Sequence, residues 1–351
     1  MKSKRVLPLA LLIFTALPTT FPSDCTAQSD YYAGKTIQII VSSSAGGGTD
    51  MAARLVGNIM PKYLPGNPNT VAQNMAGAGG RVANNFFARE AKPNGFTLLQ
   101  GDTNSLISFT RGGSSVNYDP RKYEALGAIV RGGSILVSRK DAQARLSNKS
   151  AKPVVVGDID GITSWVAMTV WGADYLGWNL RCIYGYRGTQ ETLLALRRGE
   201  IDMWGSTNAK LVRDLVKDGL VDVITQQDSE RRSDFPDVPT FIELLGNKRP
   251  SGAAWEAYLA WAGPTSVDKF LVAPAGTPKE IVTLLRQAFN NMAKDDQFKA
   301  QAATFFGDEW RVISGEKTGA LIREVTTISP EAQNFLTQIR RKYELPLGTA
   351  E

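Results

Sequence analysis

Short apolar runs alternate along the chain with longer stretches that have helical spacing. The first apolar run covers residues 36–41, is rich in β-branched residues, and precedes three serines and three glycines. Such a run is typical of a parallel strand that is covered on both faces. Behind the glycines, apolar residues recur on one helix face, at Ala52, Ala53, Leu55, Val56 and Ile59. The pattern predicts a strand, a turn and a helix that begins near Thr49.

The same order of elements continues to residue 118. The predicted elements are strands at 70–74 and 96–100 and a helix at 81–91. Strands and helices that alternate with short connections are typical of a parallel sheet with helices on both faces. Two apolar runs then follow, 125–130 and 135–138, with little room for a helix between them. We interpret this change as a crossing into a second lobe.

A second set of strands and helices follows the crossing. Its predicted strands cover residues 153–156, 179–184, 201–204 and 221–225, and its predicted helices cover 165–176, 190–198 and 209–217. A strand at 269–272 returns the chain to the first lobe, and the remainder has helical periodicity. The chain is longer than a usual single domain, which agrees with two lobes. We predict a two-lobed α/β fold, in which each lobe is a mostly parallel sheet flanked by helices and a two-strand hinge joins the lobes. The predicted boundaries are 28–127 and 259–351 for the first lobe and 128–258 for the second.

The start of the chain has the pattern of an export signal. Three basic residues precede an apolar run at 6–17, and a polar stretch ends at the small residue Ala27. The run is too short to span a bilayer. We therefore predict a signal peptide over residues 1–27, cleaved after Ala27, and a mature protein in the periplasm. Lipid attachment at Cys25 is the alternative, although the residues before it are not the small apolar ones of a lipoprotein signal.

Composition narrows the classes of function. The chain has 351 residues, with 40 Lys and Arg and 34 Asp and Glu. Removal of residues 1–27 takes away three basic residues and one acidic residue, which leaves a net charge of +4. The charges are dispersed, so no nucleic-acid partner is indicated, and a weak positive field favours small anions. The absence of histidine excludes histidine-based catalysis and the usual metal sites, so we predict no metal and no cofactor.

Three predicted turns between a strand and a helix form the candidate site, at 42–50, 157–165 and 185–190. Ligands of doubly wound sheets bind beyond the carboxyl ends of the strands, and two hinged lobes can close over them. The glycines at 46–48 expose backbone N–H groups, and a helix N-terminus attracts anions. A carboxylate beside an anion site would repel the ligand, so we assign Asp50 to holding its loop. Tight turns and helix caps without a ligand are the alternative.

Arg187 lies in the third turn and is the candidate for a charged contact with a ligand. A guanidinium can bind a carboxylate through two hydrogen bonds, or it can instead pair with Glu191 on the helix surface. Tyr186, Trp165 and Trp204 are candidates for an aromatic wall, and burial in the core is the alternative for them.

Two enzyme classes fit the sequence poorly. The turn at 77–80 lies between a strand and a helix, as in dinucleotide-binding proteins, but Val82 stands where the third glycine of that motif would be. Close packing of the helix at 81–91 explains these glycines as well. No Gly-x-Ser-x-Gly elbow is present, and a serine nucleophile would lack a histidine base. We predict binding without catalysis, with a nicotinamide-dependent oxidoreductase as the alternative.

Seven short motifs keep the order and spacing of one known family over nearly the whole mature chain. They are residues 45–50 (AGGGTD) with Ala53 and Arg54, 74–80 (NMAGAGG), 94–99 (NGFTLL), 185–189 (GYRGT), 198–202 (RGEID), 238–240 (VPT) and 273–278 (APAGTP). In these motifs the chain resembles the substrate-binding proteins of tripartite tricarboxylate transporters, the Bug family. It departs from the usual pattern of that family at the serines 42–44 and at Gly185. Both departures lie in the predicted pocket, so they concern the ligand more than the fold.

The resemblance implies a periplasmic-binding-protein fold and a function in transport. A monomer would capture a small organic carboxylate, either a di- or tricarboxylate or an aromatic acid, and deliver it by hinge closure to the membrane subunits of such a transporter. Turns 42–50 and 185–190 would hold the two ends of the carboxylate. The full set of candidate ligand-binding residues is Ser42, Ser43, Ser44, Ala45, Gly46, Gly47, Gly48, Thr49, Thr103, Asn104, Thr163, Ser164, Tyr186, Arg187, Gly188 and Thr189. A sensor subunit that presents its ligand to a signalling partner is the alternative.

Overall fold

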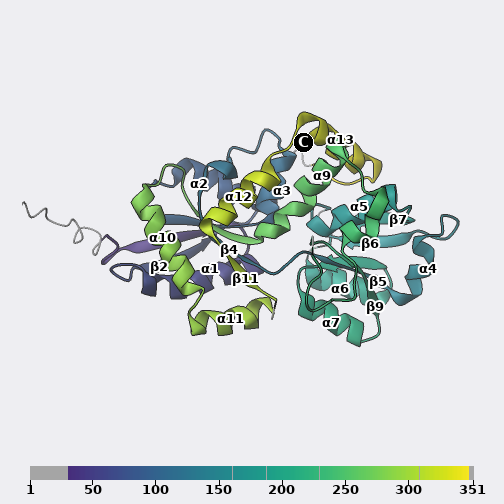
Figure 1. The fold of residues 1–351 in the computed structure, drawn as a ribbon, viewed down its shortest axis with the longest axis horizontal. Helices are drawn as coiled ribbons and strands as arrows, with labels where there is room; N and C mark the ends of the chain where they lie inside the picture. Colours follow the sequence, from purple (N-terminus) through teal and green to yellow (C-terminus); the bar gives the residue numbers. More distant parts are fainter. Residues whose placement is uncertain (1–30, 160, 187, 229, 308, 348–351) are drawn as a thin grey trace, which may run out of the picture.

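Two β-sheets surrounded by helices make up the chain in a computed structural model, which describes residues 31–347 except 160, 187, 229 and 308 (Figure 1). Each sheet forms the centre of one lobe, so the predicted two-lobed α/β fold is confirmed. The predicted signal peptide lies outside the described residues.

The first sheet has six strands in the order β11-β4-β10-β3-β1-β2. They are β1 (Thr36–Val41), β2 (Asn69–Asn74), β3 (Thr97–Asp102), β4 (Glu124–Val130), β10 (Lys269–Ala273) and β11 (Arg311–Ser314). β1 pairs in parallel with β2 and β3, whereas β10 runs antiparallel to β3 and β4. The sheet is therefore mixed, with its parallel strands on one side.

Helices cover both faces of the first sheet and bury two separate apolar clusters. One cluster joins the sheet to α1 (Gly48–Ile59), α10 (Lys279–Met292) and α11 (Asp296–Phe306). The other joins it to α2 (Arg81–Glu90), α3 (Thr103–Arg111) and α12 (Gly315–Thr326). Side chains alternate along a strand, so Ile39 and Val41 of β1 face the first cluster and Ile40 faces the second.

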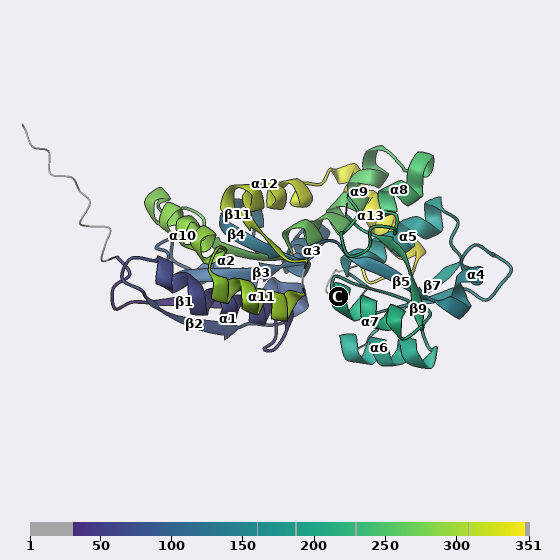
Figure 2. The same ribbon diagram turned by 60° about the horizontal axis from the view of Figure 1, so that its bottom comes forward.

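The second sheet has five strands in the order β7-β6-β8-β5-β9. They are β5 (Ile135–Arg139), β6 (Val154–Asp158), β7 (Leu180–Tyr184), β8 (Met203–Ser206) and β9 (Val221–Gln226). On one side of it lie α5 (Ser164–Tyr175), α8 (Phe241–Leu245) and α9 (Gly252–Ala262), and on the other α6 (Thr189–Arg198) and α7 (Ala209–Lys217) (Figure 2). The short helix α4 (Gln143–Leu146) follows β5. Apolar residues from all of these elements form one cluster.

Strands β5 and β10 run against their neighbours because each begins where the chain crosses between the lobes. After β4, residues 131–134 lead into β5, whose first residue Ile135 lies opposite Ser206 at the end of β8. In the same way, Lys269 at the start of β10 lies opposite Asp102 at the end of β3. The crossings therefore bring the first residues of β5 and β10 to the edge at which the parallel strands end.

The C-terminal helix α13 (Pro330–Lys342) packs beside α9, and both lie between the lobes at the top of Figure 1. Ala332, Leu336 and Ile339 of α13 belong to the apolar cluster of the second lobe. The sequence pattern predicts that residues 259–351 belong to the first lobe. The structure places α13 against the second lobe instead, because its apolar face packs on α9 and not on the first sheet. The chain thus makes a third crossing at residues 327–329, in addition to the two predicted hinge segments.

Candidate ligand-binding cleft

A cleft with a volume of about 490 Å³ lies where the two lobes meet. The carboxyl ends of β1, β3, β6 and β8, the first residue of β10 and Ser134, just before β5, open onto it. In Figure 2, α1 and α11 lie on the first lobe's side of this junction, and α6 and α7 lie on the second lobe's side. The candidate residues that line the cleft are Ser43, Gly47, Gly48, Thr49, Thr103, Asn104, Thr163, Ser164 and Thr189. The candidates that do not line it are Ser42, Ser44, Ala45, Gly46, Tyr186 and Gly188, and Arg187 lies outside the described residues.

Five helices begin at the cleft, and they differ in how their first turns are capped. Asp102 caps α3 by accepting from the N–H of Ser105, and Asn208 caps α7 by accepting from the N–H of Leu211. In the part of the chain that the structure describes, α1, α5 and α6 have no side-chain cap. Uncapped first turns leave backbone N–H donors and the positive end of the helix dipole for another acceptor. This arrangement suits an anion in the cleft.

The serines and glycines of the first turn differ in position. Ser43 and Gly47 line the cleft, whereas Ser44 and Gly46 face solvent. Gly46 has a φ of +78°, which residues with a side chain rarely adopt. Gly47 has a φ of −80° and a ψ of 166°, an ordinary extended conformation. Glycine is therefore required at position 46 by the backbone, and at position 47 it keeps the cleft open.

Asp50 holds the first turn together, as the sequence analysis predicted. Its carboxylate accepts the N–H of Gly46 at 2.8 Å, the guanidinium of Arg54 at 3.0 Å and the amide of Asn74 at 2.9 Å. Burial alone would raise the pKa of Asp50, but these hydrogen bonds lower it below the usual value. Asp50 is thus ionised and occupied within its own loop.

The end of β3 is tied to the start of α1. The hydroxyl of Thr49 donates to the carboxylate of Asp102 at 3.0 Å, and the same carboxylate accepts from Ser105 at the start of α3. Thr103 and Asn104 follow directly and line the cleft. Asp102 therefore positions two helix N-termini.

The second lobe contributes hydroxyl groups at the start of α5. Ser164 and Ser134 share a hydrogen bond of 3.1 Å between their hydroxyls, which joins α5 to the crossing at 131–134. The hydroxyl of Thr163 is buried and has no hydrogen-bond partner among the described residues. A buried unpaired hydroxyl costs free energy, so a ligand atom that pairs with Thr163 would recover it.

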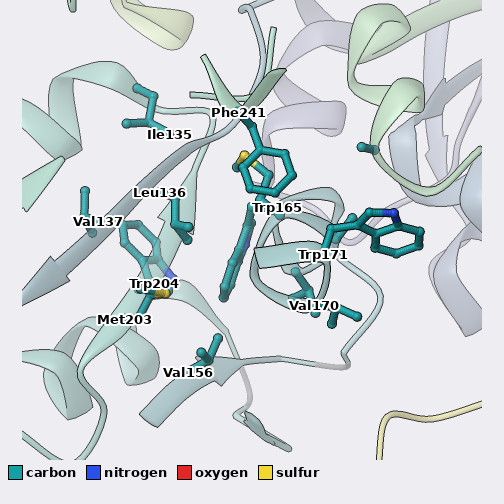
Figure 3. Close-up of a cluster of buried hydrophobic side chains, with 14 of the residues drawn as sticks. Ile135, Leu136, Val137, Val156, Trp165, Val170, Trp171, Met203, Trp204 and Phe241 are labelled. Atoms are coloured by element: carbon teal, nitrogen blue, oxygen red, sulfur yellow. The ribbon is translucent and has the colours of Figure 1, made fainter. Parts of the chain in front are cut away.

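Two of the three candidate wall aromatics reach the cleft. Trp165 and Trp204 line it, although each indole is about 95% buried in the core of the second lobe. Figure 3 shows both indoles beside Leu136 and Met203. A Cβ at Gly205 would lie 2.5 Å from Trp165, so that position must stay a glycine for the indole to pack there. Both tryptophans therefore belong to the core of the second lobe and also border the cleft, and a role in binding a ligand stays a prediction.

A buried cluster of charges in the cleft is absent from the sequence-based set of candidates. Arg131 donates to Asp268 at 2.6 and 3.1 Å, and Lys269 donates to Asp268 at 2.9 Å. All three line the cleft beside the start of α1, because a Cβ on Gly48 would lie 3.6 Å from the Cε atom of Lys269 and 3.9 Å from the guanidinium of Arg131. The two cations therefore lie next to an uncapped helix N-terminus, together with the carboxylates of Asp268 and of Asp102, which lies opposite Lys269 in the sheet.

The cations also control the ionisation of Asp268. Burial by itself would raise its pKa, but attraction to Arg131 and Lys269 outweighs burial and lowers the pKa to about 2. One sequence signal hinted at this cluster, since Lys269 is a charged residue at the start of an otherwise apolar strand. Its partners could not be predicted, because Arg131 lies far away in the chain and meets it only through the pairing of β10 with β4.

The remaining carboxylates of the cleft serve local contacts. Asp102 accepts from Thr49 and Ser105, and Asp158 accepts the N–H of Gly161 at 2.8 Å.

No group of three or more Cys, Asp or Glu side chains that could hold a metal ion occurs within the described ranges. No described helix is both long and apolar enough to cross a membrane.

The glycine turn at 77–80 packs against a helix. A Cβ on Gly79 would lie 2.5 Å from the hydroxyl of Ser108, and one on Gly80 would lie 2.3 Å from the hydroxyl of Ser105. Both serines belong to α3, so these glycines let the turn approach that helix closely. The sequence pattern predicts close packing of the helix at 81–91 as the reason for these glycines, whereas Gly79 and Gly80 approach α3.

Two α/β lobes, linked by crossing segments and separated by a cleft at their strand ends, define a solute-binding protein of the periplasmic type. The chain belongs to the tripartite tricarboxylate transporter family of receptors, whose family model matches residues 52–325. This confirms the resemblance. The proteins of this family bind substrates and are not enzymes, so the prediction of binding without catalysis is also confirmed.

Individual relatives agree with this assignment. A UPF0065 protein of Bordetella pertussis is 25% identical over 289 residues, which are 80% of this chain and 83% of that one. The protein BugT of the same organism is 27% identical over 290 residues, with 79% and 83% of the two chains covered. Both alignments extend over most of each chain.

Solved structures share the fold. A TctC solute-binding protein from Polaromonas superposes with a TM-score of 0.66 at 20% identity, over 89% of this chain and 99% of the other. MatC from Rhodopseudomonas palustris with bound malate gives a TM-score of 0.58 at 22% identity, over 86% and 99% of the chains. A second R. palustris protein, solved with adipate, gives 0.61 at 17% identity, over 88% and 97%.

Proposed function

We propose that this protein captures a small organic carboxylate in the cleft between its lobes and delivers it to the membrane subunits of a tripartite tricarboxylate transporter. The observation that carries the proposal is that α1 of the first lobe and α5 and α6 of the second begin at one cleft without side-chain caps. An anion held between them would pair with donors from both lobes.

The first lobe also supplies two cations to the cleft. Arg131 and Lys269 lie beside the start of α1, and the carboxylates of the lining are engaged, Asp268 by these two cations and Asp102 and Asp158 by local hydrogen bonds. Two proteins of the same fold were solved with dicarboxylates, malate and adipate. A ligand of this kind has a carboxylate for each lobe.

Capture would proceed by closure of the lobes, in a monomer exported to the periplasm. The ligand favours the closed form because only that form brings donors of both lobes to it at once. Thr103 and Asn104 would add contacts from the first lobe, and Thr163 and Thr189 from the second. Arg187 would supply a charged contact from the third turn.

A ligand panel tests the proposal. Mature protein is heated with malate, adipate, benzoate and further mono- and dicarboxylates, and in parallel with the matching amides or methyl esters. At least one acid should raise the melting temperature by several degrees, because a ligand at a hundred times its Kd stabilises by about 2.7 kcal/mol and each kcal/mol shifts a domain of this size by about 2–4 °C.

The uncharged analogues serve as controls, because they keep the shape of the acid and lose its charge. The best acid should also shrink the radius of gyration in solution scattering. If no acid stabilises the protein and an amide, ester or nicotinamide does, carboxylate capture is wrong.

A further inference from the structure

The backbone carbonyl of Pro346, close to the C-terminus, is bonded by arginines from both lobes. Arg111 at the end of α3 donates to it at 3.0 Å from the first lobe. Arg340 on α13 donates to it at 2.8 and 2.6 Å from the second. One carbonyl group therefore links the lobes.

Arg340 also reaches the turn that leads into the cleft. Its guanidinium donates to the carbonyl of Gly161 at 2.9 Å and lies 4.3 Å from the ring centre of Trp261. The indole of Trp261 in turn donates to the carbonyl of Ile162 at 3.0 Å. These two carbonyls directly precede Thr163, the N-cap residue of α5. The start of α5 is thus held from behind, on the side away from the cleft.

The packing around this contact is close. Gly161 has a φ of +66°, and a Cβ on it would lie 2.9 Å from the Cδ atom of Pro346. Arg340 is about 98% buried, although it is a charged residue on a surface helix. The hydroxyl of Tyr184 donates to the carbonyl of Glu344 at 2.9 Å and fixes the same segment to β7. We call residues 343–347 the C-terminal strap.

A second contact joins the strap's helix to the first lobe. The side-chain amide of Gln333 on α13 donates to the carbonyl of Arg111 at 3.3 Å. A movement of α3 relative to the second lobe therefore acts on both Gln333 and Pro346. Through Arg340 the same movement acts on Gly161, three residues before Ser164, the first residue of α5.

We propose that Arg340 and Arg111 are positioning residues for ligand capture. Arg340 holds the turn before Thr163 so that the first N–H groups of α5 point into the cleft, and Arg111 couples that turn to the position of the first lobe. The proposal rests on the proposed function, because it assumes that α5 contributes to ligand binding. It assigns a role in ligand binding to side chains that do not line the cleft.

Substitutions by methionine test the two positions, since methionine keeps much of the length of arginine and removes the donors. Arg340→Met and Arg111→Met are compared with Arg341→Met, which changes an exposed arginine on the same helix. Arg340→Lys keeps a charge over Trp261 and one donor group. Ligand affinity for the best acid of the panel, the melting temperature without ligand and the radius of gyration without ligand are measured for each.

Both test variants should bind the acid about tenfold more weakly than the wild type, because buried carbonyls lose their donors and the turn shifts. Arg340→Lys should recover part of the loss, and Arg341→Met should match the wild type. Without ligand, Arg111→Met should have a larger radius of gyration than both the wild type and Arg341→Met. Its melting temperature should remain similar to theirs. A general loss of stability would not produce that combination.

A failure of the proposed carboxylate capture can be distinguished from a failure of the positioning role of Arg340 and Arg111. If the wild type binds no carboxylate, the proposed function fails, and the ligand-free scattering of Arg111→Met still tests the strap. If Arg340→Met does not fold, the half-buried Arg111 decides the result. Arg111→Met could also bind the acid within twofold of the wild type and keep an unchanged radius of gyration. That result would overturn the proposal that Arg111 couples the turn before α5 to the position of the first lobe.

Discussion

The side of the cleft formed by the first lobe carries charged side chains, whereas the side formed by the second lobe carries mainly hydroxyl groups and indole edges. On the first lobe, Asp268 lies between Arg131 and Lys269, and all three are largely withdrawn from solvent. On the second lobe, Thr163, Ser164 and Trp204 line the cleft. The two sides meet the same ligand with different chemistry.

The cost of burial explains the difference. A buried charge needs a partner, so the first lobe holds its two cations around the carboxylate of Asp268. A neutral hydroxyl costs less to bury, so the second lobe can leave that of Thr163 without a partner among the residues described. We expect charges of the first lobe to set affinity and groups of the second lobe to adjust it.

The largest effect is expected from Asp268→Asn, which leaves Arg131 and Lys269 buried without their counter-charge. Breaking a buried ion pair costs about 3–5 kcal/mol, so urea unfolding should show a loss of that size. Asp296→Asn is the matched control, because Asp296 pairs with Lys299 in full solvent and should cost under about 1 kcal/mol. Equal losses of unfolding free energy in Asp268→Asn and Asp296→Asn would contradict the buried ion pairing of Asp268 with Arg131 and Lys269.

The same residue predicts a pH dependence. The pKa of Asp268 is lowered to about 2 in the folded protein, below its usual value of 3.8. The ionised carboxylate of Asp268 therefore stabilises the folded state against unfolding. This contribution is complete above about pH 4, is lost as the pH falls towards 2, and amounts to about 2 kcal/mol of unfolding free energy. Stability curves between pH 5 and 2 should be flatter for Asp268→Asn than for the wild type.

Lys269→Met tests whether the ammonium group of Lys269 acts on the ligand. Arg131 still pairs with Asp268, so the variant should fold, while affinity for the best acid should fall by about 1.5–3 kcal/mol, the value of a hydrogen bond to a charged group. Calorimetric titration measures the change, and Lys92→Met, an exposed lysine outside the cleft, is the control. Unchanged affinity would restrict the role of Lys269 to folding.

A smaller effect separates the two glycines of the first turn. Gly46→Ala should destabilise the protein by about 1–2 kcal/mol, because its φ of +78° is left-handed. Gly47→Ala should cost under about 0.5 kcal/mol, since a Cβ there meets nothing closer than 3.5 Å. The comparison is made by thermal unfolding without ligand, and a reversed order would show that the turn differs from this geometry.

The smallest effect is expected from Thr163→Val on the second lobe. Without ligand the change should be neutral or slightly stabilising, because it removes a buried hydroxyl that has no partner in the described structure. With ligand, affinity should fall by about 0.5–1.5 kcal/mol if the hydroxyl bonds the carboxylate. Thr207→Val, at another cleft position of the same lobe, provides the comparison. A clear loss of ligand-free stability would mean that Thr163 is already paired.

The sequence by itself determined the two-lobed α/β fold, most of its strands and helices, and several of the turns that border the cleft. The apolar runs at 36–41 and 153–156 and the turns behind them are local features, and strand ends in such sheets form ligand sites. Gly47 and the hydroxyls at 163 and 164 were found in this way.

Only the tertiary structure decided which of these residues reach the cleft and which charges accompany them. Lys269 joins Arg131 through the pairing of β10 with β4, and Arg340 reaches Gly161 because α13 packs across the second lobe. Such contacts join residues far apart in the chain, and their energies depend on burial and on partners that local patterns do not contain.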